Sequence, residues 1–219
     1  MLGMILPADV ESEERFGEAP GGVLFPEEEM IIAHAVESRR REFATVRVCA
    51  RACLARLGYA QVPILPGVGG TPTWPAGVQG SMTHCAGYAA AAVGPMPPIS
   101  AIGIDAEPDA PLPDGVLNLI ATPAERDRLA VTQQEPDSPN WDRLLFSAKE
   151  AVYKAWFPLV GEWLDHQEAE ILFDPLDRTF AVALSRDDLI VDGRQIRRLS
   201  GRWARQRGIL VTAVVLGSA

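Results

Sequence analysis

Lysine is almost absent from this sequence of 219 residues, because only two of its twenty basic residues are lysine and the rest are arginine. Both lysines, Lys149 and Lys154, lie in one short segment. An ammonium group is a compact charge on a flexible stem, whereas a guanidinium group is a rigid planar fork, so the two are not interchangeable. The pattern therefore singles out this segment, because it is where the chain keeps two compact, flexible ammonium groups.

Cysteine is also scarce, and long apolar runs are missing. The three cysteines, Cys49, Cys53 and Cys85, form an odd and sparse set, which argues against a disulfide framework and favours a reducing compartment. No window approaches the length of a membrane span, and the first ten residues lack the basic region of a signal peptide. We therefore expect a cytoplasmic protein with no membrane segment.

Acidic residues outnumber basic residues, so the formal net charge is −9. Proteins that bind nucleic acid through its phosphates usually present an excess of positive charge, so we expect no nucleic-acid partner. An acidic chain can still carry a local basic pocket for a small anion.

The segment that holds the two lysines has the pattern of a helix. Ser138 is a suitable N-cap, Pro139 suits the first helical position, and Pro158 is expected to end the helix. The apolar residues between them recur at helical spacing, which predicts one buried face: Trp141, Leu145, Ala148, Val152 and Ala155.

Glu150 and Lys154 are four residues apart, so both lie on one face of this helix, with Lys149 beside them. One interpretation is an exposed ion pair that stabilises the helix by about 0.3 kcal/mol. The other is a reactive site, and the segment alone does not decide between them.

A second strong helix is predicted over residues 37–57, with Gly58 as its C-terminal cap. Arg40, Arg47 and Arg51 are spaced by seven and four residues, so they line up within about 20° on either side of Arg40 around the helix axis. Glu37 and Glu42 are too few to neutralise the six arginines of this helix, which are Arg39, Arg40, Arg41, Arg47, Arg51 and Arg56. The face is either solvated or part of an anion site.

Two carboxylates are predicted to share one side of a strand over residues 99–108. Asp105 and Glu107 alternate with Ile102 and Ile104, so the two carboxylates lie about 7 Å apart on the side opposite the isoleucines. Gly103 leaves room there for a close neighbour. Paired carboxylates at a strand end are typical of a site for a hard cation such as Mg²⁺.

The other segments yield weaker predictions. Residues 1–30 are acidic and irregular apart from a short helix from Pro26, and residues 59–80 form a loop rich in proline and glycine. We expect two strands with a turn near Gly87 over 80–93, a helix after Thr122, a linker over 132–140, and strands near 169–173, 179–184 and 208–216. Residues 194–207 are interpreted as a solvated strand pair.

Three stretches together resemble the 4′-phosphopantetheinyl transferases: Gly80-Ser81-Met82-Thr83-His84-Cys85, Gly103-Ile104-Asp105-Ala106-Glu107, and the segment 146–155 around Lys149-Glu150. The chain is similar to the large, monomeric class that activates surfactin and enterobactin synthetases. Its arginine-rich helix resembles the actinobacterial branch.

The resemblance implies an α+β fold, a pseudo-dimer of two lobes over 1–108 and 109–219. Each lobe is a long helix on a small antiparallel sheet, and the active site lies in the cleft between them. It also implies transfer of the phosphopantetheine arm of coenzyme A to a serine of apo acyl or peptidyl carrier proteins, with release of adenosine 3′,5′-bisphosphate. The metal is expected to be Mg²⁺, for which Mn²⁺ can substitute.

The site residues implied by the resemblance fall into three groups. The metal ligands are Asp105, Glu107 and Glu150, and the catalytic residues are Glu150 and Lys149. Coenzyme A is expected to contact Arg39, Arg40, Arg47, Ser81, Thr83, His84, Lys149 and Lys154. The loop Pro66–Thr71 departs from the family pattern because it contains no basic residue, so Arg47 or another arginine is expected to compensate.

Two other functions are compatible with parts of the pattern. A metal-dependent nuclease or phosphohydrolase could use Asp105, Glu107 and Lys149, but the acidic composition argues against it. A non-catalytic module could bind carrier proteins without modifying them, although all three acidic positions are present.

Overall fold

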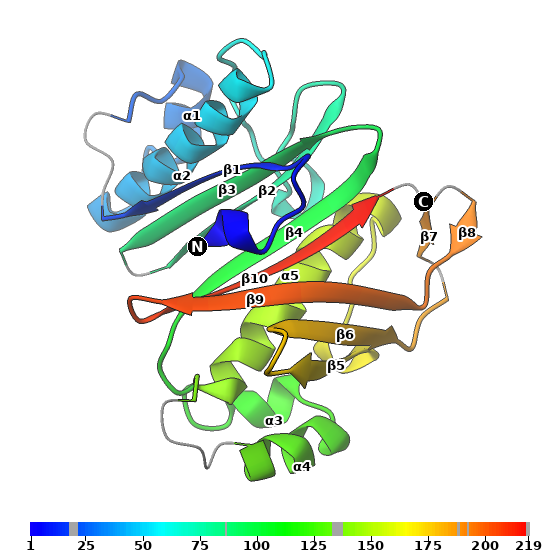
Figure 1. Cartoon of the computed structure of the whole chain (residues 1–219). Coiled ribbons are helices and arrows are strands. Elements are labelled where there is room, and N and C mark those ends of the chain that lie inside the picture. The colour runs from blue at the N-terminus through cyan, green and yellow to red at the C-terminus, as the bar shows by residue number, and fades with distance from the viewer. Residues whose placement is uncertain (18–21, 86, 133–137, 188, 192, 218–219) are drawn as a thin grey trace.

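The computed structural model describes residues 1–17, 22–85, 87–132, 138–187, 189–191 and 193–217. Two antiparallel sheets dominate it, and a long helix packs against each of them (Figure 1). This arrangement confirms the predicted α+β fold, with one long helix on each sheet. None of the helices in these ranges is both long and apolar enough to cross a membrane.

The first half contains a three-stranded sheet in the order β1-β3-β2, covered by helix α2. Its elements are η1 (Leu2–Met4), β1 (Glu11–Phe16), α1 (Pro26–Ile31), α2 (Glu37–Arg56), η2 (Val68–Gly70), β2 (Val78–Cys85) and β3 (Tyr88–Pro95). The small alanines of β3 let α2 approach closely: the Cys49 and Cys53 thiols lie 3.8 and 3.7 Å from carbonyl oxygens of β3. Both cysteines are buried free thiols.

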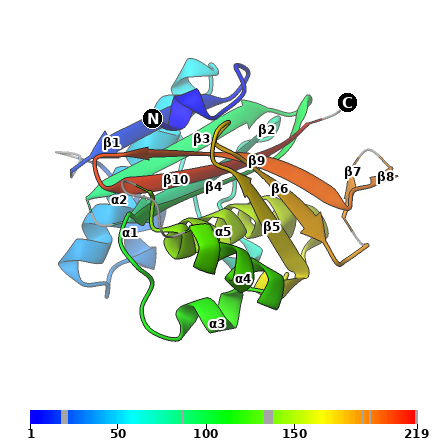
Figure 2. The same cartoon turned by 60° about the horizontal axis from the view of Figure 1, so that its bottom comes forward.

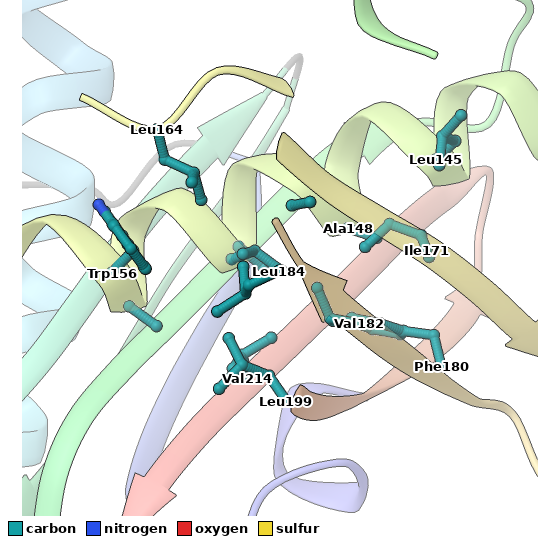
Figure 3. Close-up of a cluster of buried hydrophobic side chains, with 14 of the residues drawn as sticks. Leu145, Ala148, Trp156, Leu164, Ile171, Phe180, Val182, Leu184, Leu199 and Val214 are labelled. Carbon is teal, nitrogen blue, oxygen red and sulfur yellow. The ribbon is translucent and has the colours of Figure 1, made fainter. Parts of the chain in front are cut away.

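The second half contains a five-stranded sheet in the order β4-β10-β9-β6-β5 and a separate two-stranded ribbon. Its elements are β4 (Ile99–Pro108), α3 (Val116–Ile120), α4 (Pro123–Thr132), α5 (Trp141–Val160), η3 (His166–Glu168), β5 (Ala169–Asp174), β6 (Thr179–Leu184), β7 (Ile190–Val191), β8 (Arg194–Gln195), β9 (Arg198–Gln206) and β10 (Ile209–Gly217). The apolar face of α5, with Ala148 and Trp156, packs on strand residues such as Val182 and Val214 (Figure 3).

Strand β4 forms the seam between the two halves (Figures 1 and 2). It pairs with β10 along its whole length, so its backbone belongs to the second sheet. Two hydroxyl groups of β2 join the other side, because Ser81 Oγ accepts the Ile104 N–H at 3.1 Å and Thr83 Oγ1 accepts the Ala106 N–H at 3.0 Å. The predicted domain boundary after residue 108 therefore places β4 in the first half, although its hydrogen-bonded partner β10 lies in the second.

Gly103 brings α5 onto β4. A Cβ atom at this glycine would lie 1.9 Å from the carbonyl oxygen of Ala151 and 2.6 Å from the backbone nitrogen of Ala155. Only a residue without a side chain permits this approach, which confirms the predicted close neighbour. The contact places the middle of α5 directly beside the carboxylates of β4.

Several predicted boundaries were wrong. Helix α5 begins after the N-cap Asn140, and it continues through Pro158 to end at Gly161, which has a φ of 75°. Residues 11–16 form an edge strand that their acidic composition concealed. Strand β9 lies between β10 and β6 rather than in a solvated pair. Most of the predicted linker, 133–137, lies outside the described residues.

Candidate active site

Asp105 is a nearly buried carboxylate at the seam. Its Oδ1 atom accepts a hydrogen bond from the Lys154 ammonium at 2.7 Å and lies 3.4 Å from the Thr83 hydroxyl. Its Oδ2 atom is buried and has no hydrogen-bond partner in the described structure. Burial raises the pKa of Asp105, and the charge of Lys154 opposes that shift.

Glu107 lies two residues further along the same strand, and Arg143 from α5 donates to its Oε2 atom at 3.0 Å. Burial and the charge of Asp105 raise the pKa of Glu107, whereas Arg143 lowers it. No local sequence pattern indicated this partner, because Arg143 is 36 residues away along the chain.

Glu150 contributes a third carboxylate from α5. Of the two interpretations of this segment, the exposed Glu150–Lys154 ion pair is not observed, because Lys154 pairs with Asp105 and Glu150 lies 3.1 Å from the Nε2 atom of His166. Burial alone would raise the pKa of Glu150, but the hydrogen bond with His166 and the charge of Lys154 lower it. Glu150 is therefore ionised at neutral pH.

The three carboxylates influence one another, since Glu150 raises the pKa of Asp105 and Asp105 raises that of Glu107. Within the described ranges, no three His, Cys, Asp or Glu side chains converge closely enough to form a complete metal site. The donors nevertheless suit a hard divalent cation, because they are carboxylate oxygens and Oδ2 of Asp105 is already free of hydrogen bonds.

A cleft of about 760 Å³ is lined by residues of both halves. Of the three carboxylates only Glu150 lines it, and Lys154, which pairs with Asp105, lines it as well. One wall comes from α2, the loop before β2 and β2 itself; the other comes from α5. Its ionisable side chains are Arg39, Arg47, His84, Glu150, Tyr153 and Lys154. The predicted position of the site, between the two halves, agrees with this geometry.

Arg47 is built into the wall of this cleft rather than solvated. It donates to the carbonyl oxygen of Ile64 at 3.1 Å, its guanidinium lies 3.1 Å from the centroid of the Phe43 ring, and it lies 3.4 Å from the buried carboxylate of Glu28. Burial lowers the pKa of Arg47 to about 10, with Glu28 opposing the shift, so the group stays charged at neutral pH.

Arg40 and Arg51, which share the predicted face of α2 with Arg47, do not form an anion site with it. Arg51 is buried and donates to both oxygens of Glu28, at 2.9 and 3.0 Å. Arg40 donates to the carbonyl oxygen of Ile32 and does not line the cleft, so the structure gives no support for its predicted contact with coenzyme A. The neutralising acid was missed because Glu28 comes from α1, 23 residues before Arg51.

The β2 motif divides into structural and cleft residues. The hydroxyls of Ser81 and Thr83 hold the backbone of β4, although Ser81 also lines the cleft. His84 contacts Arg39 through Nε2 and lies 3.5 Å from Glu42 through Nδ1. Burial and the charge of Arg39 lower the pKa of His84, so it is neutral at pH 7.

Lys149 does not reach the cleft. Its ammonium lies 2.9 Å from Glu125, and it donates to the carbonyl oxygens of His166 and Ala169 at 2.6 and 2.9 Å. The side chain is 1% exposed. The prediction that Lys149 contacts a phosphate of coenzyme A is therefore wrong for this structure, because Glu125 and two backbone carbonyl oxygens already bind the ammonium.

These residues define a class of protein before any comparison. A cleft lined by cations and by Glu150, with Asp105 paired to the lining residue Lys154, suits an enzyme that transfers a phosphorylated group. Cations bind phosphate oxygens, and carboxylates bind the metal that assists transfer.

Comparison with known proteins identifies the family. Residues 27–94 match the model of the 4′-phosphopantetheinyl transferase N-terminal domain, and residues 101–203 match that of the 4′-phosphopantetheinyl transferase superfamily. The chain is 48% identical to 4′-phosphopantetheinyl transferase Svp of Streptomyces mobaraensis, over 100% of this chain and 90% of that one.

The chain also matches two further relatives over almost the whole length of each protein. The chain is 44% identical to 4′-phosphopantetheinyl transferase PptT of Mycobacterium tuberculosis, over 99% of this chain and 98% of that protein. It is also 44% identical to 4′-phosphopantetheinyl transferase Npt of Nocardia iowensis, over 98% and 99%. The chain belongs to the 4′-phosphopantetheinyl transferase family, which transfers phosphopantetheine from coenzyme A to carrier proteins.

Proposed function

We propose that this transferase binds coenzyme A in the cleft between its halves and uses Mg²⁺, or Mn²⁺ in its place, at the carboxylates of Asp105, Glu107 and Glu150. The observation that carries the proposal is the unpartnered, buried Oδ2 atom of Asp105 beside a cleft lined with cations. A metal held there would supply positive charge to the pyrophosphate oxygens.

The basic side chains of the cleft divide between the two phosphate groups of coenzyme A. Arg39, Arg47 and His84 belong to the first half, and we assign them to the 3′-phosphate, the two arginines as cations and the neutral His84 as a hydrogen-bond donor. Arg39 and Arg47 also supply the charge that the loop Pro66–Thr71 lacks, because this loop lines the same cleft. Lys154 lies beside Asp105 and is assigned to the pyrophosphate.

In the transfer itself, the serine oxygen of the carrier attacks the phosphorus that bears the pantetheine arm. The bond from that phosphorus to the bridging oxygen breaks, and adenosine 3′,5′-bisphosphate leaves with the bridging oxygen. The serine proton passes to a base, for which Glu150 is the ionised carboxylate of the cluster that faces the cleft. Lys154 offsets the charge of the departing bisphosphate.

We also propose that the enzyme acts as a monomer in the cytoplasm. Both walls of the cleft come from one chain, so a second copy is not needed to complete the site. The cysteines in the described part of the chain are free thiols, which fits a reducing compartment. Acyl and peptidyl carrier proteins are the proposed partners.

The test is mass spectrometry of an apo carrier protein incubated with enzyme, coenzyme A and Mg²⁺. The wild type should add one phosphopantetheine group, and Asp105→Ala should abolish the addition and the effect of Mg²⁺ on thermal stability in the presence of coenzyme A. Asp114→Asn, which changes an exposed carboxylate, is the matched control. Full Mg²⁺-dependent activity in Asp105→Ala would contradict the metal assignment.

Glu150→Gln tests the proposed base separately. The variant should still bind coenzyme A, but its single-turnover rate should fall at least ~100-fold, the low end of the effect of a lost general base. A wild-type rate would contradict the role of Glu150.

A further inference from the structure

His166 contacts the proposed base from outside the cleft. Its Nε2 atom lies 3.1 Å from Oε1 of Glu150, and its ring stacks on Phe146 with 6.2 Å between centroids and an interplanar angle of 15°. His166 does not line the cleft, so any effect on transfer must act through Glu150.

The backbone of His166 is itself held in place. The carbonyl oxygen of His166 accepts a hydrogen bond from the Lys149 ammonium at 2.6 Å. Lys149 is paired with Glu125, and Glu125 accepts the backbone N–H groups of Ile171 and Thr122 at 2.7 and 2.8 Å. The consecutive residues Lys149 and Glu150 thus hold the same loop, one by its backbone and the other by the imidazole.

This arrangement restricts a flexible side chain. A glutamate can adopt many rotamers, and a hydrogen bond from a fixed donor limits the orientations of its carboxylate. The donor is fixed because its ring is stacked and its backbone is bonded to a buried ammonium. Neighbours that orient a metal-binding or catalytic carboxylate usually affect activity by about 10–100-fold.

We propose that His166 is a positioning residue of this transferase: it orients the Glu150 carboxylate, and the Lys149–Glu125 pair holds His166 for that purpose. The inference rests on the proposed role of Glu150. It also gives the buried Lys149 a function in the reaction without any contact with coenzyme A.

Two amides of different length test the inference. The His166→Gln side chain can place its amide donor near the position of Nε2, whereas the His166→Asn amide is one methylene shorter and does not reach Glu150. We expect the single-turnover rate of His166→Asn to fall ~10–100-fold and that of His166→Gln to stay within about threefold of wild type. His166→Phe, which keeps the stacking ring but has no donor, should behave like His166→Asn.

Binding measurements separate positioning from general damage. The affinity for coenzyme A without metal should be the same in all three variants, because His166 does not line the cleft. The Mg²⁺ concentration needed to stabilise the coenzyme A complex against heat should rise in His166→Asn and His166→Phe only. Equal losses in His166→Gln and His166→Asn, or weaker coenzyme A binding in both, would overturn the inference.

A double-mutant cycle separates this inference from the proposed function. His166→Asn should slow transfer no further in the Glu150→Gln background, because its effect acts through that carboxylate. A wild-type rate for Glu150→Gln would remove the proposed base and the inference together. A slow Glu150→Gln with a normal His166→Asn, or equal losses in both backgrounds, would overturn the role of His166 alone.

Discussion

Lys149 and Glu125 form an ion pair in the interior of the second half, with 2.9 Å between Nζ and Oε2 and both side chains 1% exposed. Burial lowers the pKa of Lys149, and Glu125 opposes the shift. Removing one partner of such a pair leaves an uncompensated buried charge, which costs far more than the pair contributes.

We therefore expect Lys149→Ala to reduce the free energy of unfolding by ~3–5 kcal/mol, as measured by urea denaturation. Lys149→Met combined with Glu125→Gln should recover much of this loss, since it removes both charges. Arg197→Ala is the control, because Arg197 and Asp187 form an exposed pair whose loss should cost under ~1 kcal/mol. A Lys149→Ala variant as stable as the control would show that the pair is not structurally important.

The contact of α5 with β4 gives a second prediction. Gly103→Ala should destabilise the protein by about 3 kcal/mol or more, because the added Cβ meets backbone atoms of α5 that cannot move aside individually. Gly3→Ala is the control, since its Cβ would lie 3.2 Å from the adaptable hydroxyl of Ser12. Equal stability of the two variants, measured by thermal unfolding, would contradict this packing.

Local patterns predicted the scaffold of the site well. The alternation from Ile102 to Glu107 placed both carboxylates on one side of a strand, and Gly103 indicated the close approach of a helix. These features depend on the periodicity of a strand and on the missing side chain of glycine, so they are encoded within a few residues.

The partners of the charged groups could not be predicted in the same way. Arg143 reaches Glu107 across 36 residues, and Arg51 reaches Glu28 across 23, so only the tertiary fold brings them together. The direction of the Lys149 side chain could have been predicted more readily, because residues five apart on a helix differ by about 140° around its axis. Lys149 and Lys154 could therefore not both face one cleft.

Asp109 gives a prediction about pH. Burial raises its pKa, but hydrogen bonds from the backbone and side chain of Asn140, with the charge of Arg205, lower it overall. Because Asn140 is the N-cap of α5, this carboxylate anchors the start of the helix. A carboxyl group whose pKa is lowered by folding stabilises the folded protein at any pH above its pKa in the unfolded chain, about 3.9 for Asp. This stabilisation is lost as the pH falls through the pKa of the group in the folded protein.

We expect Asp109→Asn to be less stable than the wild type at pH 7, and the difference should shrink below about pH 4. Unfolding in urea at several pH values measures this difference. Asp114→Asn, with an exposed carboxylate, should show no comparable trend. A difference that grew on acidification would mean that Asp109 is protonated more readily in the folded protein.

The last prediction concerns the cationic end of the cleft. Arg39 and His84 contact one another and line the cleft, whereas Arg56 at the far end of the same helix pairs with Glu11 and Glu13 of β1. If the first two bind the 3′-phosphate of coenzyme A, the wild type should prefer coenzyme A to the analogue without this phosphate. Arg39→Ala and His84→Ala should each reduce that preference by roughly tenfold, the effect of one lost hydrogen bond to a charged group. Arg56→Ala should leave it unchanged. The measurement is the ratio of the two dissociation constants by calorimetry, and a constant ratio in all three variants would place the 3′-phosphate at another part of the cleft.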